Sequence, residues 1–222
     1  MEFQYATEWR QSEEQRPLSL SLPLTVDDVP LEGGGVETYF ENLLPDSDSI
    51  RRRVQDRFGA PSRQPFDLLA AIGRDCVGAV QLLPVDEQPT GIKRIEAERL
   101  SEAAVARAIA AAVSPAAANI DTDEFRVSIA GAQEKTAFLR HGGRWCRPLG
   151  STPTTHIFKL PLGLVGNMRA DMSESVENEW LCSRILTGYG LPIAHCDIEH
   201  FGEFKVLVVE RFDRILHSSG KF

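Results

Sequence analysis

The segment Val127-Ser-Ile-Ala-Gly-Ala-Gln-Glu-Lys-Thr136 predicts two strands that are joined by a bend of small residues. We expect the first strand over Phe125 to Ile129 and the second over Glu134 to Arg140. The bend between them, Ala130-Gly131-Ala132-Gln133, has no bulky apolar side chain to cover its backbone N–H groups. Such a bend can point N–H groups at the oxygens of a polyphosphate. A plain β-hairpin turn is the alternative interpretation, because the bend contains a single glycine.

Downstream of this segment, the pattern predicts further strands and one main helix. A turn at His141 to Arg144 leads into a strand at Trp145 to Arg147, and His156 to Leu160 is another strand. The helix runs from Ser173 to about Thr187, and two strands follow it. The apolar stripe of the helix is Val176, Trp180, Leu181 and Ile185, and the two strands are Ile193–His200 and Phe204–Glu210. This order of elements is typical of the N-lobe of a protein kinase.

A lysine interrupts the apolar strand from His156 to Leu160. Lys159 stands between Phe158 and Leu160, and a lysine on the inner face of a sheet needs an anionic partner, because burying a lone charge is costly. Phosphate oxygens would serve, and an acidic residue on the following helix would orient the ammonium group. Glu179 is our candidate for that role, with Glu177 as the other possibility. The alternative interpretation is that the side chain of Lys159 points to solvent.

The last predicted strand ends in charged residues. Glu210, Arg211 and Phe212 stand where a kinase offers backbone groups to adenine, between its two lobes. A charged patch at a strand end is the alternative interpretation. No residue of this region is predicted to bind a metal.

The first half of the chain predicts short elements. A period-two alternation indicates a strand at Pro17–Leu24, and an apolar run indicates another at Val77–Leu83. Short helices are expected over Glu37–Leu44 and Phe66–Ile72. Between them, a helix with its cap at Asp46–Ser49 is expected to run to Phe58, where Gly59 ends it. A further helix is expected over Glu102–Val113, with Ser101 as its cap. Residues 84–91 have the composition of a linker or long turn, and Ser114-Pro115 stops the last helix.

Composition and charge exclude several classes of protein. The 222 residues carry a formal net charge of −8, and the one basic cluster, Arg51-Arg52-Arg53, is expected to form a solvated helix face. Direct binding of nucleic acid is therefore not expected. No run of about 18 apolar residues occurs, and the first residues do not form a signal peptide, so we expect a cytoplasmic protein without a membrane segment. The four cysteines are expected to be reduced and mostly buried, and the five histidines show no metal-ligand spacing.

Taken together, these segments resemble the HipA family of toxin–antitoxin kinases. The most specific stretch is Ser128-Ile-Ala-Gly-Ala-Gln-Glu-Lys135, and the others follow the family's order across nearly the whole chain. They are Arg16–Leu24, Phe40–Asp46, Ser62–Leu69, Ile72–Asp75, Pro153–Ile157, Asn178-Glu179 and Val209–Arg214.

The resemblance implies an α+β fold in two parts. Residues 1–118 would form the family's N-terminal subdomain of mixed strands and short helices, with a shortened start. Residues 119–222 would form a kinase-like N-lobe, with an antiparallel sheet and one main helix, that ends just after the hinge. The family enzyme uses ATP and Mg²⁺. The ATP-contacting residues would be Ala130, Gly131, Ala132, Gln133, Glu134, Lys135, Lys159, Glu210, Arg211 and Phe212, with Glu179 orienting the lysine. Ser128 would match the family's regulatory phosphorylation site.

One part of the family pattern is absent from the sequence. The family places its catalytic aspartate in an Asp-Gly-His-x-x-Asn-type loop, and none of the 222 residues forms one. We therefore expect a truncated or split serine/threonine kinase that is inactive alone. Its partner would be a helix-turn-helix antitoxin or a second chain with the kinase C-lobe. The alternative is a non-catalytic binding module that pairs with such a C-lobe, a full-length kinase or the antitoxin.

Overall fold

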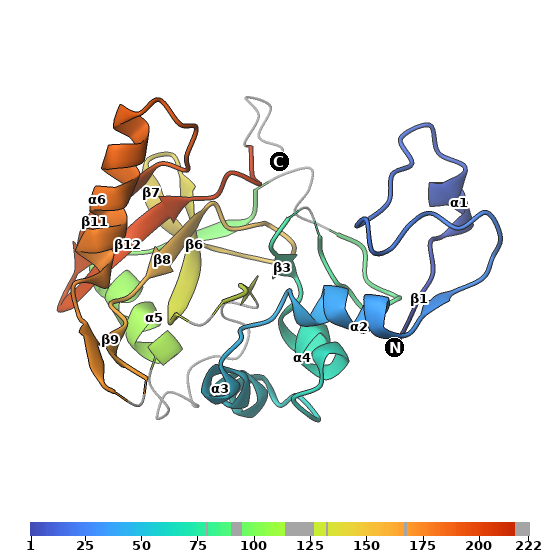
Figure 1. Cartoon of the computed structure of the whole chain (residues 1–222), viewed down its shortest axis with the longest axis horizontal. Helices are drawn as coiled ribbons and strands as arrows, with labels where there is room; N and C mark the ends of the chain where they lie inside the picture. Colours follow the sequence, from blue (N-terminus) through green and yellow to red (C-terminus); the bar gives the residue numbers. More distant parts are fainter. Residues whose placement is uncertain (79, 90–94, 114–126, 132, 167, 216–222) are drawn as a thin grey trace.

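The computed structural model describes residues 1–78, 80–89, 95–113, 127–131, 133–166 and 168–215. Within them, helices and strands mix in an α+β architecture, with a six-stranded sheet and a group of short helices beside one end of it (Figure 1). No helix in these ranges is long and apolar enough to cross a lipid bilayer.

The six-stranded sheet is antiparallel throughout and has the order β11-β12-β8-β6-β7-β4. Its strands are β4 (Ala97–Arg99), β6 (Lys135–His141), β7 (Arg144–Pro148), β8 (His156–Lys159), β11 (Cys196–Phe201) and β12 (Phe204–Glu210). The turn between β6 and β7 contains Gly142 and Gly143, both with positive φ, as a tight hairpin requires. A separate two-stranded hairpin, β9 (Gly163–Val165) and β10 (Ala170–Met172), was not predicted from the sequence.

A helix packs against each face of this sheet. On one face, α5 (Glu102–Val113) buries Val105 and Ile109 against Phe138 and Phe158. On the other face, α6 (Ser175–Gly188) packs Val176 against Leu207. The period-two alternation of the strands produces these two apolar faces, because successive side chains point to opposite sides. Lys159 follows Phe158, so it lies on the α6 face.

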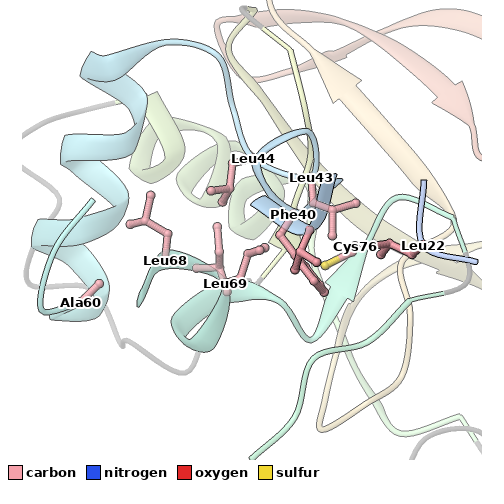
Figure 2. Packing of buried hydrophobic residues seen from close by; sticks show 10 residues of the cluster. Leu22, Phe40, Leu43, Leu44, Ala60, Leu68, Leu69 and Cys76 are labelled. Carbon is pink, nitrogen blue, oxygen red and sulfur yellow. The ribbon is translucent and has the colours of Figure 1, made fainter. Parts of the chain in front are cut away.

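The N-terminal part of the chain has its own hydrophobic core. It contains α1 (Thr7–Arg10), α2 (Gly34–Glu41), α3 (Asp48–Phe58) and α4 (Pro65–Ile72), and a two-stranded sheet of β1 (Glu2–Phe3) and β2 (Leu31–Glu32). Figure 2 shows Phe40, Leu44, Leu68 and Leu69 packed together at the centre of this core. The short strand β3 (Asp75–Cys76) pairs in parallel with β5 (Val127–Ser128). Apolar residues at helical spacing on α2 and α4 account for the packing.

Two predicted strands are wrong. Over Pro17–Leu24 the structure has only a bridge between Ser19 and Leu22, because local hydroxyl and turn hydrogen bonds replace a strand ladder, and Leu20 is 98% exposed. The described residues of Val77–Leu83, which exclude residue 79, form no strand, and the Leu82 N–H donates to the Gly73 carbonyl at 2.8 Å. Neither alternation nor an apolar run in a short segment therefore sufficed to predict a strand.

Most predicted helices are confirmed, with shifted ends. The helix over Glu102–Val113 matches α5, and Ser101 Oγ accepts a hydrogen bond from the Ala104 N–H at 3.2 Å, as a cap should. Gly59 ends α3 with φ +64°. The helix expected from Glu37 instead begins at Gly34 and ends at Glu41. The stop at Ser114-Pro115 lies outside the described residues.

The predicted boundary at residue 118 stays a prediction. β4 and α5 precede that residue, and both pack with the large sheet.

Candidate functional site

The predicted phosphate loop lies between β5 and β6. Gly131 has φ +107°, a conformation that residues with a Cβ rarely adopt. The Lys135 ammonium donates a hydrogen bond to the Ala130 carbonyl, and it lies 2.6 Å from where a Cβ on Gly131 would stand. The missing side chain of Gly131 therefore makes room for the lysine to fold back over the bend. Ala132 lies outside the described residues.

Side chains of this loop are tied to other parts of the protein. Gln133 donates from Nε2 to the Leu160 carbonyl at 2.6 Å, which fixes the loop against the end of β8. Glu134 forms an ion pair with Arg53 of α3. The prediction that Arg51-Arg52-Arg53 is a solvated face is therefore wrong for Arg53, and also for Arg51, which pairs with Glu41. The side chains of Arg51 and Arg53 are partly buried because they form ion pairs with Glu41 and Glu134.

Lys159 lies directly opposite Lys135 on the neighbouring strand, and it pairs with a glutamate of α6. The strand register sets Lys135 against Lys159, so two ammonium groups share one face of the sheet. Lys159 donates to Glu179, the glutamate that the sequence favoured for this position. Burial lowers the pKa of Lys135, and the positive charge of Lys159 lowers it further. The arrangement concentrates positive charge beside the bend, and the carboxylates of Asp46 and Glu179 compensate it in part.

A second lysine–glutamate pair joins the sheet to the same helix. Lys205 of β12 donates to Glu177, the other glutamate considered from the sequence. Neither lysine of the loop region contacts Glu177 among the hydrogen bonds and ion pairs of the described residues. Sequence reasoning missed Lys205, although its period-two spacing from Leu207 places it on the α6 face.

The predicted hinge residues have different environments. The Glu210 N–H donates to the His195 carbonyl at 2.8 Å, and the Arg211 N–H donates to the Thr155 carbonyl at 2.9 Å. These two donors are already engaged, so adenine would have to use carbonyls of the segment or the N–H of Phe212. The Phe212 residue is 88% exposed, whereas the Arg211 side chain is only 1% exposed.

The buried guanidinium of Arg211 belongs to a network that sequence reasoning missed. Arg211 Nη1 lies 3.1 Å from Asp75 Oδ1, and Arg214 Nη2 lies 2.9 Å from the same oxygen. Asp213 accepts from Arg211 at 2.8 Å, and Thr154 Oγ1 donates to Asp75 at 2.6 Å. We call Asp75, Thr154, Arg211, Asp213 and Arg214 the hinge cluster. Two carboxylates balance two guanidinium groups, which is what burial of charge requires.

Protonation in the hinge cluster follows from these contacts. Burial alone would lower the pKa of Arg211, but Asp213 and Asp75 outweigh it and raise the value. Burial would raise the pKa of Asp213, and Arg211 and Arg214 instead hold it below its usual value. Both groups therefore stay charged at neutral pH.

The predicted regulatory serine lies on β5, next to β3. Ser128 is the register partner of Cys76, the residue that follows Asp75 of the hinge cluster. Burial, and then the charge of Asp75, raise the pKa of the Cys76 thiol to about 12, so this thiol is not a nucleophile at neutral pH. Cys76, Cys146 and Cys196 are buried and Cys182 is exposed, and all four are free thiols.

The described ranges contain no group of three or more His, Cys, Asp or Glu residues that could hold a metal ion.

The fold and the site define a kinase-like N-lobe joined to a helical N-terminal unit, and comparison with known proteins agrees with this class. Residues 1–83 match the HipA N-terminal domain, and residues 127–221 match the HipA-like C-terminal domain. The chain belongs to the HipA family.

Relatives and a solved structure cover nearly the whole chain. A Sinorhizobium fredii protein, Y4mE, which is named as a kinase, is 31% identical over 222 residues, which are 98% of this chain and 50% of the relative. The serine/threonine-protein kinase toxin HipA of Shewanella oneidensis is 29% identical over 216 residues, or 95% of this chain and 44% of the relative. A HipA in a Shewanella oneidensis complex of HipA, HipB and operator DNA superposes with a TM-score of 0.65 and 26% identity, over 96% of this chain and 46% of that one. The chain thus spans about half the length of these relatives.

Proposed function

We propose that these residues are the nucleotide-holding part of a HipA-like serine/threonine kinase. The single observation that carries the proposal is the pairing of Lys159 with Glu179 beside the bend at Gly131. A lysine held in this way by a helix glutamate is the device with which kinases fix ATP phosphates. The names of the relatives support a kinase toxin at the level of the family.

In this proposal, ATP lies between the loop and the hinge. The backbone of residues 130–135 and the ammonium groups of Lys135 and Lys159 would hold the phosphates, because they supply N–H donors and positive charge. Backbone groups of Glu210, Arg211 and Phe212 would face adenine. Mg²⁺ would neutralise phosphate charge during transfer.

Phosphoryl transfer also needs a residue that positions the substrate hydroxyl. The 222 residues contain no Asp-Gly-His-x-x-Asn segment. We propose that a further stretch of polypeptide, in the same protein or in a second chain, supplies it, and that these 222 residues alone transfer no phosphate. Phosphorylation of Ser128 would add nearly two negative charges beside the phosphate site and would weaken ATP binding by repulsion.

The test is nucleotide binding by the purified chain and by two matched variants. Binding of a fluorescent ATP analogue with Mg²⁺ should be weak for the wild type and weaker still for Lys159→Met, because the phosphates lose one of their two ammonium partners. Lys205→Met removes the neighbouring lysine–glutamate pair and should keep the wild-type affinity. Equal loss in both variants would mean that general packing of α6, and not a phosphate site, explains the effect.

Labelled ATP decides whether these residues are inactive alone. We expect no labelled product. Tight Mg-ATP binding together with autophosphorylation at Ser128 would refute the inactive form and would leave the kinase assignment in place.

A binding module is the second candidate, favoured by one separate observation. The second half of α6 and the loop after it expose large apolar side chains, namely Leu181, Ile185, Leu186, Tyr189 and Leu191. A HipB-like antitoxin, a kinase C-lobe or a full-length kinase could cover this face, and no direct contact with DNA is proposed. Titration of such a partner with the wild type and with Ile185→Asp would test this function, since a binding module should lose affinity for its partner in that variant.

We also propose that the protein is located in the cytoplasm.

A further inference from the structure

The N-terminal part of the chain contacts the proposed nucleotide site at two separate places. One contact is at the phosphate loop and the other is at the hinge, which are the two ends of the proposed ATP site. The parts that meet are far apart in sequence, since Arg53 reaches Glu134 and Asp75 reaches Arg211. Both contacts therefore form only when the chain adopts its tertiary structure.

The contact at the loop end comes from α3 and the residues before it. Arg53 forms its ion pair with Glu134, and both side chains are partly shielded from solvent. The Asp46 N–H donates to the Gly131 carbonyl, at 3.4 Å. One contact holds a side chain of the loop and the other holds its backbone, so α3 restricts where the bend lies.

The contact at the hinge end comes from β3. The Asp75 carboxylate is almost fully buried and accepts hydrogen bonds from Arg211, Arg214 and the Thr154 N–H, the last at 2.8 Å. The Gly78 N–H donates to Asp213 Oδ2 at 2.8 Å. A buried carboxylate with this many donors has one low-energy position, so it fixes the segment that follows β12.

The strand β3 connects the two ends. It pairs with β5, which leads into the phosphate loop, and its Asp75 holds the hinge cluster. We propose that the N-terminal unit braces the nucleotide site, with Arg53 and Asp75 as positioning residues that hold the phosphate loop and the hinge at a fixed separation. This inference rests on the proposed function.

The expected consequence is preorganisation. A loop and a hinge that are already in place lose less conformational entropy when ATP binds. An unbraced site, in contrast, adopts the conformation that can bind ATP in only a fraction of the molecules. Apparent affinity falls in proportion to that competent fraction. Neither Arg53 nor Asp75 needs to touch the nucleotide for this effect.

A double-mutant cycle at the loop end separates bracing from direct contact. The variants are Arg53→Gln, Glu134→Gln and the double variant, and the measurement is affinity for the fluorescent ATP analogue with the melting temperature recorded beside it. We expect each single variant to lose affinity about three- to fivefold and the double variant to lose no more than either, because all three lack the same ion pair. Arg52→Gln is the control, since Arg52 is the neighbouring, exposed residue that pairs with Asp48.

Other outcomes of this cycle have distinct meanings. Tighter binding by Glu134→Gln would show that a freed Arg53 contacts phosphate, which would overturn the brace. Unchanged affinity in all variants would overturn it too. A lower melting temperature with unchanged affinity would show a structural role only, and would likewise refute a positioning role.

Hydrogen exchange tests the hinge end without nucleotide. In the free chain, Asp75→Asn should speed exchange of amides in residues 127–135 as well as in 210–214, because β3 joins the two. Asp197→Asn, which breaks the exposed pair with Arg184, should leave both unchanged. If Asp75→Asn does not fold, Thr154→Val removes one hydrogen bond to Asp75 and takes its place.

Failure of the brace and failure of the proposed function are distinguishable. If the wild-type chain binds no nucleotide, the proposed function fails for these residues, and hydrogen exchange still decides whether the two ends are coupled. If the wild type binds and Asp75→Asn affects only residues 210–214, the proposed function stands and the brace is refuted.

Discussion

At the scale of single residues, the site brings two positive charges close together and offsets their repulsion only in part. Lys135 and Lys159 face each other across two strands, and their repulsion opposes folding. Glu179 and the Ala130 carbonyl compensate in part. Burial, and then the second lysine, lower the pKa of Lys135, so both disfavour its charge. A polyanion would relieve this cost, which is why the arrangement suits a phosphate site.

The charge balance predicts the effect of removing Glu179. Glu179→Gln removes the carboxylate that pairs with Lys159 and leaves Asp46 as the remaining carboxylate that favours the charge of Lys135. It should destabilise the chain by about 1 kcal/mol or less, because Glu179 is partly exposed and solvent screens it. Adding inorganic triphosphate should restore the lost stability, as measured by thermal melting. Glu177→Gln breaks the pair of Lys205, which is not a strand partner of Lys135, and triphosphate should not restore that variant.

Gly131 offers a second test at this scale. Gly131→Ala should cost about 1–2 kcal/mol in urea unfolding, because alanine is strained at φ +107° and its Cβ would displace the Lys135 ammonium. Gly142→Ala is the control, since that position has positive φ but nothing within 4 Å of a new Cβ. An equal loss of unfolding free energy in the two variants would show that the close approach of Lys135 to Gly131 contributes nothing to stability.

At the scale of elements, sequence patterns succeeded where the structure depends on local interactions. The helix α5 was predicted at its bounds, because a serine cap and apolar spacing are both local signals. The strand β3 could not be predicted, because its two residues are held by a parallel partner about 50 residues away. The pairing of Lys159 with a helix glutamate was expected, whereas the pairing of Asp75 was not, because its partners Arg211 and Arg214 are far away in the sequence.

The main helix α6 shows the limit of periodicity and yields a prediction. Its predicted apolar stripe is not buried along its whole length, since Val176 is buried whereas Leu181 and Ile185 are about half exposed. Val176→Ala should therefore destabilise the chain by about 1–3 kcal/mol, and Ile185→Ser should change stability little. Comparable destabilisation by the two variants in urea would place Ile185 in a core, against the structure.

At the scale of the whole molecule, the hinge cluster joins the N-terminal unit to the large sheet through charges. Arg211 and Asp75 are both buried, so the attraction between them is little screened. Breaking a buried pair leaves an uncompensated charge and costs more than the pair contributes. The junction should thus respond to pH through Asp213 more sharply than the hydrophobic cores on either side.

Acid should weaken this junction through Asp213. The folded-state pKa of Asp213 lies below its ordinary value, so its contribution to stability is fully present above the unfolded pKa of about 3.9 and is lost as pH falls through the folded pKa. In urea unfolding between pH 7 and pH 3, Asp213→Asn should be less stable than the wild type near neutrality, and the difference should shrink below about pH 4. A difference that stays constant over this range would mean that Asp213 contributes by shape and hydrogen bonding alone. Because the guanidinium groups of Arg211 and Arg214 keep their charge throughout, protonation would leave them facing each other across a neutral partner.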